Sequence, residues 1–166
     1  MQNIIAADVH TKIWNLSYKL FKDEGSLPCT FVQADILDIG NEKWKPVLGN
    51  MDIVYASYFF HLWDLEMQSV VFKAVASLLR PVDGSVVFGI MLGGEIARYE
   101  DFIGTERRMF CHNKASLQEL CDRIGKETGQ HFVADAKLEH LQEHIKVGPL
   151  TNANYRLLYF SITLKI

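Results

Sequence analysis

Residues 51–91 read MDIVYASYFFHLWDLEMQSVVFKAVASLLRPVDGSVVFGIM, with one helix-like segment between two strand-like segments. Asp64 is a good N-cap, and one apolar stripe at helical spacing follows it: Met67, Val70, Val71, Ala74, Val75, Leu78 and Leu79. Residues 80–84 end the helix, because proline cannot continue it and glycine permits the turn. The flanking runs, 51–57 and 85–91, are typical of buried strands. This order predicts a right-handed crossover between parallel strands.

The same alternation extends outward in both directions. Further strand-like segments lie at residues 3–9, 29–35, 132–138 and 155–166. A helix begins at His10 or Thr11, and Asn113 can cap another helix that ends before Gly129. The last two segments have no convincing helix between them, which indicates an antiparallel hairpin. We therefore expect an α/β, Rossmann-like, doubly wound and mostly parallel sheet, with helices on both faces and an antiparallel C-terminal edge hairpin.

Composition limits the class of protein. The 166 residues are 49% hydrophobic and 22% charged, which predicts one domain, residues 1–166, with a real core. The net charge of −3 gives no electrostatic reason to expect nucleic acid or an anionic membrane, and no apolar run approaches the roughly 18 residues of a membrane span. Three cysteines without a Cys-x-x-Cys motif favour a reducing compartment, so we expect a cytoplasmic protein.

Two aspartates end neighbouring predicted strands. Asp8 ends the first strand, and Asp35, followed by Ile36, ends the second. Ligands of open α/β sheets bind beyond the carboxyl ends of the strands. A carboxylate there can accept hydrogen bonds from the vicinal hydroxyls of a ribose, and a second can accept from an adenine amine. Capping of the following turn explains each aspartate equally well.

The third strand runs into an aromatic segment, residues 57–64, with the sequence SYFFHLWD. His61 is the only plausible base there, and Trp63 could form the wall of an apolar pocket. The competing interpretation is that these aromatic residues belong to the core. We expect no metal site, because His140 and His144 lack an evident third ligand.

Several motifs together resemble those of class I S-adenosylmethionine-dependent methyltransferases. They are IAAD at residues 5–8, FVQADI at 31–36 and DIVYASYFFH at 52–61. The later motifs LLRP at 78–81, GSVV at 84–87, FCHN at 110–113 and GKETG at 125–129 look like those of fungal methyltransferases in polyketide and meroterpenoid pathways.

This resemblance implies S-adenosylmethionine as the cofactor. Asp8 would hold the ribose, Asp35 and Ile36 the adenine, and Ala56 and Ser57 would line the cofactor beneath an acceptor pocket formed with Tyr58 and Trp63. It also implies methylation of a carboxyl or hydroxyl oxygen on a small hydrophobic metabolite. A hydroxyl acceptor would need a base, for which His61 is the candidate.

One departure from the family pattern is large. The family begins with a strand and a Gly-x-Gly loop, and that first, central strand pairs with the strands that here end at Asp8 and Ser57. Neither feature occurs in this sequence, so we expect a domain truncated at its N-terminus. The alternatives are an inactive remnant, or one part of a split domain or homo-oligomer. A nicotinamide-dependent oxidoreductase on a similar sheet is a weaker hypothesis, since its glycine fingerprint is also missing.

Overall fold

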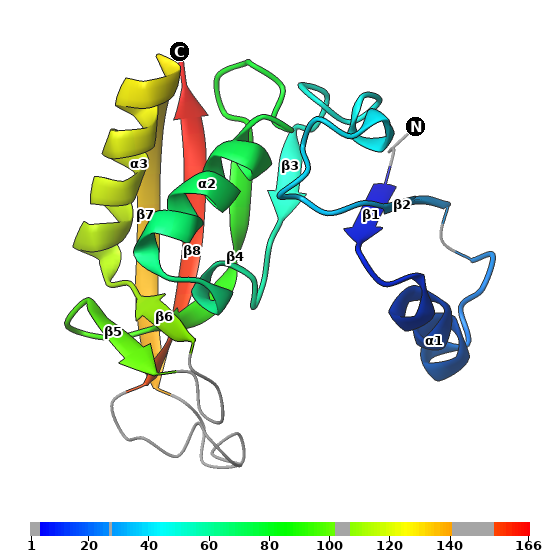
Figure 1. The fold of residues 1–166 in the computed structure, drawn as a ribbon, viewed down its shortest axis with the longest axis horizontal. Helices are drawn as coiled ribbons and strands as arrows, with labels where there is room; N and C mark the ends of the chain where they lie inside the picture. Colours follow the sequence, from blue (N-terminus) through cyan, green and yellow to red (C-terminus); the bar gives the residue numbers. More distant parts are fainter. Residues whose placement is uncertain (1–3, 27, 102–106, 141–154) are drawn as a thin grey trace. The chain divides into compact units, whose positions relative to one another are not determined.

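The computed structural model describes residues 4–26, 28–101, 107–140 and 155–166 (Figure 1). The chain divides into two compact units, Met1–Leu48 and Gly49–Ile166, and each is described by itself. His144 lies outside the described residues. Within the described part, no helix combines the length and apolar character needed to cross a membrane.

The first unit is a strand–helix–strand crossover followed by a short 3-10 helix. Its elements are β1 (Ile4–Asp8), α1 (Thr11–Phe21), β2 (Cys29–Gln33) and η1 (Glu42–Trp44). β1 and β2 pair in parallel, with Ile4 opposite Cys29 and Asp8 opposite Gln33. Trp14 of α1 stacks on Phe31 of β2, with ring centroids 5.0 Å apart, and so packs the helix against the strands. The predicted elements are confirmed, with somewhat shorter strands.

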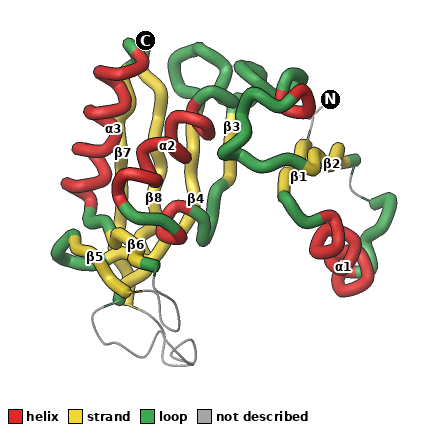
Figure 2. The backbone as a smooth tube through the Cα atoms, in the orientation of Figure 1, coloured by secondary structure: helices red, strands yellow, loops and turns green. Residues whose placement is uncertain are grey.

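The second unit contains a four-stranded sheet in the order β3-β4-β8-β7 (Figure 2). Its strands are β3 (Ile53–Tyr55), β4 (Val86–Gly93), β7 (His131–His140) and β8 (Arg156–Lys165). β3 and β4 are parallel, and β8 runs antiparallel to both β4 and β7. The expected C-terminal antiparallel hairpin is thereby confirmed.

Local capping chemistry defines the helices of this unit. η2 spans Phe60–Leu62, α2 spans Leu65–Ala76 and α3 spans Lys114–Thr128. The Asp64 carboxylate accepts a 2.8 Å hydrogen bond from the Met67 backbone N–H at the start of α2. Asn113 forms a capping box with Ser116, and Gly129 ends α3 with a positive φ of 72°.

Both helices lie on the same face of this sheet (Figure 1). Phe72 of α2 meets Phe132 of β7 with ring centroids 5.3 Å apart, and Phe60 meets Phe160 of β8 at 5.8 Å. The other face carries exposed apolar side chains, namely Ile53, Tyr55, Phe88, Val133 and Tyr159.

Within the second unit, the helices α2 and α3 therefore cover one face of the sheet. The crossovers β3–α2–β4 and β4–α3–β7 advance in the same direction along the sheet. Right-handed connections that advance in one direction place their helices on one face.

A second small sheet was not expected from the sequence. β5 (Arg98–Asp101) and β6 (Arg108–Cys111) pair antiparallel, with Arg98 opposite Cys111. The end of β6 is tied to β4 by an isolated bridge between Gly93 and His112. This sheet brings the beginning of α3 close to the end of β4.

Candidate functional site

The two aspartates lie at the same end of neighbouring strands. Asp8 is the last residue of β1, and Asp35 follows the last residue of β2 by two positions. Because β1 and β2 are parallel and Asp8 is opposite Gln33, both carboxylates lie beyond the carboxyl ends of this pair. Both side chains are exposed, and the neighbouring Ile36 is half-buried.

Each aspartate also holds its own turn. Asp8 Oδ1 accepts a 2.6 Å hydrogen bond from the backbone N–H of His10, and Asp35 Oδ1 accepts one of 2.9 Å from that of Leu37. The turn-capping role considered from the sequence is thus present in both. The second carboxylate oxygen, Oδ2, has no hydrogen-bond partner among the described residues in either case. Each aspartate can therefore cap its turn and still accept a hydrogen bond from a ligand.

A second group of candidates, Ala56 to Trp63, belongs to the second unit. Beyond the end of β3, the chain keeps pairing with β4 through an alternating set of hydrogen bonds. The Ala56 N–H donates to the carbonyl of Phe88 at 2.9 Å, and the Tyr58 N–H donates to that of Ile90 at 2.6 Å. Between them, the Ser57 hydroxyl oxygen accepts a 3.0 Å bond from the Ile90 N–H. The Ser57 side chain thus takes the place of a backbone acceptor.

Gly89 is essential to this pairing and was not among the candidate residues predicted from the sequence. A Cβ at Gly89 would lie only 2.5 Å from the carbonyl oxygen of Ala56. A lone glycine within a strand pattern is a known sign of close backbone approach, so the signal was present in the sequence. Gly89 allows the Ala56–Ser57 backbone to lie directly against β4.

The aromatic segment divides between core and surface. Phe60 is buried, as the core interpretation expects, while Trp63 is half-buried and meets Phe59 edge-on with ring centroids 4.9 Å apart. Tyr58 is 50% exposed and has a φ of 52°, in the left-handed region that non-glycine residues rarely adopt. Its ring meets that of His61 edge-on at 6.0 Å. Backbone strain of this kind is common at functional sites.

His61 is buried and makes one polar contact with the described residues. Its Nδ1 atom accepts a 3.3 Å hydrogen bond from the backbone N–H of Leu92, near the end of β4. Burial lowers the pKa of His61 to about 4. The imidazole is therefore neutral near pH 7.

A buried polar network holds the end of the aromatic segment. Gln68 Nε2 donates to the backbone carbonyls of Trp63 at 3.0 Å and Phe110 at 2.9 Å. Gln68 Oε1 is 2.8 Å from Nε2 of His112, whose Nδ1 is 2.9 Å from the Ser116 hydroxyl. Sequence reasoning missed this network, because its members come from α2, β6 and α3 and share no local pattern.

The candidates thus form two groups in separate units: Asp8, Asp35 and Ile36 in the first, and Ala56, Ser57, Tyr58, His61 and Trp63 in the second. Among the described residues, no group of three or more His, Cys, Asp or Glu side chains could hold a metal ion.

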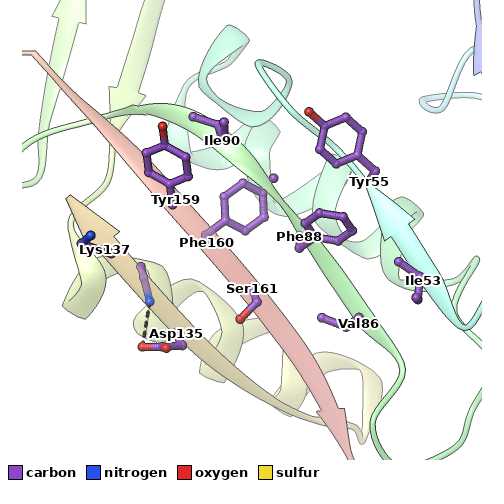
Figure 3. A pocket seen from close by; sticks show the side chains of 12 residues that line it. Ile53, Tyr55, Val86, Phe88, Ile90, Asp135, Lys137, Tyr159, Phe160 and Ser161 are labelled. Carbon is purple, nitrogen blue, oxygen red and sulfur yellow. Dashed lines mark hydrogen bonds between the residues drawn. The ribbon is translucent and has the colours of Figure 1, made fainter. Parts of the chain in front are cut away.

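A separate hollow lies on the face of the four-stranded sheet that α2 and α3 leave open (Figure 3). It has a volume of about 610 Å³, and its apolar side chains come mainly from β3, β4 and β8. Tyr55 and Phe88 line it with ring centroids 5.2 Å apart, and Asp135 and Lys137 lie on its β7 side.

No protein-family model matches the chain. It is 34% identical over 131 residues to O-methyltransferase phiE of a fungal species (strain ATCC 74256), covering 79% of this chain and 44% of that protein. It is also 33% identical over 139 residues to O-methyltransferase atr3 of Stereocaulon alpinum, covering 83% of this chain and 40% of that protein. The chain is a relative of fungal O-methyltransferases.

The fold of this methyltransferase relative agrees with the family that its sequence similarity indicates. It is similar to the 1,6-didemethyltoxoflavin-N1-methyltransferase of Burkholderia thailandensis, with a TM-score of 0.62 and 14% identity over 99% of this chain and 62% of that one. The fold is that of class I S-adenosylmethionine-dependent methyltransferases. The chain spans less than half the length of phiE and of atr3.

Proposed function

We propose that this chain carries the adenosine-binding and acceptor-facing parts of an S-adenosylmethionine-dependent O-methyltransferase. The observation that carries the proposal is the pair of carboxylates, Asp8 and Asp35, beyond the carboxyl ends of two parallel strands. The relatives phiE and atr3 are both named O-methyltransferases, and the Burkholderia structure holds S-adenosylhomocysteine.

The side chains present suit the adenosine part of the cofactor. The Oδ2 atom of Asp8 is available to accept from the ribose hydroxyls, and that of Asp35 from the adenine amine, with Ile36 packing on the ring. Ala56 and Ser57 would line the cofactor through their backbone, which the pairing with β4 holds in place. When bound, the cofactor supplies an electrophilic methyl group. The chain's contribution is to position the acceptor in line with it.

The acceptor we propose is a small hydrophobic metabolite, methylated on a carboxyl or hydroxyl oxygen. Tyr58 and Trp63 offer partly exposed aromatic surface for such a molecule. Two comparisons support a small molecule. One relative is named Asnovolin E/Chermesin D methyltransferase, and the Burkholderia enzyme holds 1,6-didemethyltoxoflavin.

We also propose that residues 1–166 form only part of the methyltransferase domain. The part still needed is a strand, a glycine-rich loop for the methionine end of the cofactor, and helical cover for the open sheet face. Three observations support this. Among the described strands, β3 pairs with β4 alone. Its residues Ile53 and Tyr55 are 62% and 66% exposed. The relatives phiE and atr3 are more than twice as long as the segments that match this chain.

A cytoplasmic location is proposed from the cysteines. Cys29, Cys111 and Cys121 are all free thiols. Burial raises the pKa of both Cys111 and Cys121 to about 12, so these two stay protonated and unreactive. Unpaired structural thiols suit a reducing compartment.

Calorimetric titration with S-adenosylmethionine tests the function, on the chain alone and on the longest polypeptide that its gene encodes. Asp8→Asn and Asp35→Asn keep the Oδ1 acceptor of each turn but remove the charge. We therefore expect folding to be retained and cofactor affinity to fall at least tenfold. Asp23→Asn is the matched control, because Asp23 follows α1 and its side chain makes no contact that is part of the site. Absence of binding by both polypeptides, or full affinity in both variants, would overturn the proposal.

A further inference from the structure

We propose that His61 is a fixed hydrogen-bond donor, which binds and orients a polar atom of the acceptor through its Nε2–H. This inference rests on the proposed function, since it assigns a role within the acceptor-facing group. It replaces the base role that the sequence alone indicates for His61.

The contact with Leu92 fixes the tautomer. A backbone N–H is always a donor, so the Nδ1 atom that receives it at 3.3 Å must present its lone pair. A neutral imidazole has one proton and one lone pair on its two nitrogens. The proton of His61 is therefore on Nε2, where the ring can donate a hydrogen bond but cannot accept one.

The ring also stays in this neutral form. His61 is 5% exposed, and burial lowers its pKa to about 4. To act as a base at neutral pH, the ring would have to accept its proton on Nδ1, the atom already engaged by Leu92. That step would break the hydrogen bond to β4 and create a buried charge, which is costly.

The Nε2–H is available to a ligand. It has no hydrogen-bond partner among the described residues. The fully buried side-chain polar atoms that lack a partner are Ser85 Oγ and Arg123 Nε, and Nε2 of His61 is not among them. Nε2 therefore keeps some accessible surface, although the residue as a whole is buried. A donor that is immobile and unpaired is well suited to orienting a ligand.

Its place in the fold agrees with this role. His61 lies in η2, the element that follows β3 after residues 56–59, and Leu92 is the last but one residue of β4. The ring thus lies at the carboxyl ends of two parallel strands, where ligands of open α/β sheets bind. The ring of the neighbouring Tyr58, with its φ of 52°, lies edge-on to His61 with ring centroids 6.0 Å apart.

Nitrogen NMR tests the tautomer independently of any enzymatic activity. The full chain is labelled with 15N-histidine, and long-range 1H–15N correlations are recorded at pH 7.5. The signal that disappears in His61→Gln identifies the residue. We expect the pattern of a neutral ring protonated at Nε2. A ring protonated at Nδ1, or one charged at this pH, would overturn the proposal.

Ligand binding tests the donor role, with 4-fluorobenzoate as a probe followed by 19F NMR in the presence of S-adenosylhomocysteine. The longest polypeptide encoded by the gene is used. His61→Leu removes the donor and should weaken probe binding at least tenfold, whereas His61→Gln offers an amide N–H and should restore most of it. Equal binding by the wild type and His61→Leu would overturn the donor role. Failure of S-adenosylhomocysteine itself to bind would instead count against the proposed function.

Discussion

Gln68 and His112 are 44 positions apart in the sequence, yet Gln68 Oε1 lies 2.8 Å from His112 Nε2, and neither residue is exposed to solvent. Because the Gln68 amide nitrogen already donates to two carbonyls, its oxygen must accept from His112. The contact joins α2 to the residue two positions before α3, and the amide nitrogen of the same Gln68 holds the carbonyl of Trp63, near the end of the aromatic segment.

Gln68→Leu should therefore destabilise the second unit. The substitution leaves the Phe110 carbonyl and the His112 N–H buried without their partner, and each such group costs about 1–3 kcal/mol. We expect the free energy of unfolding in urea to fall by about 3 kcal/mol. Val70→Ala, on the same helix at a side chain that is 45% exposed, is the control and should change it by less than about 1 kcal/mol. Equal effects of the two changes would contradict this account.

Stability should decrease in acid because of two histidines. Burial lowers the pKa of His61 and of His112 to about 4, with a smaller contribution from Arg123 at His112. The unfolded chain, with histidine pKa values near 6.5, binds more protons between about pH 6.5 and 4. The stabilisation that comes from keeping these two histidines neutral is thus complete above pH 6.5. It is lost as the pH falls, at about 1.4 kcal/mol per pH unit for each histidine.

Urea unfolding at pH 7.5, 6 and 5 measures this dependence. His112→Gln removes one of the two groups, so the change in unfolding free energy between pH 6 and 5 should be about half that of the wild type. The comparison uses the slope of the unfolding free energy with pH and not its absolute value. A general destabilisation by the substitution therefore does not affect the comparison. An unchanged slope would show that His112 does not contribute.

Gly89→Ala should disturb the segment that contains Ala56 and Ser57. The added methyl group would lie 2.5 Å from the Ala56 oxygen and 2.7 Å from its carbonyl carbon, both of which are backbone atoms. Overpacking of this kind costs about 1–3 kcal/mol. Gly40→Ala is the matched control, because no heavy atom lies within 4 Å of its added Cβ and its φ is not positive. Urea unfolding and the amide resonance of Ser57 provide the measurements.

Tyr55→Lys tests whether further polypeptide covers the open sheet face. Tyr55 is 66% exposed, so in the chain alone the substitution should change stability by less than about 1 kcal/mol and reduce the fluorescence of a bound hydrophobic dye. In the longest polypeptide encoded by the gene, the lysine would be buried and should cost several kcal/mol. Val82→Lys, in the turn before β4, is the control and should be neutral in both polypeptides. A neutral Tyr55→Lys in the longer polypeptide would argue against such cover.

Several features of the fold could be predicted because they depend on residues close together in the sequence. Asp64 and Asn113 cap α2 and α3 with their own side chains, and Gly129 ends α3 because glycine tolerates positive φ. The turn at residues 80–84 lies between α2 and β4 as expected, although α2 already ends at Ala76, before Leu78 and Leu79 of the predicted stripe. The positions of Asp8 at the end of β1 and Asp35 shortly after β2, two neighbouring parallel strands, follow from the same local order of elements.

The amino-acid order thus determined most of the helices and strands, since caps, turns and apolar periodicity act over a few residues, but it did not predict β5 and β6. Only the tertiary structure decided the state of the side chains in the candidate site. Which nitrogen of His61 carries the proton depends on Leu92, and the hydrogen bond that Gln68 Oε1 accepts comes from His112; both partners are more than 30 positions away. Hydrogen bonds and burial are set by distance in space, and folding brings such residues together without leaving a local pattern in the sequence.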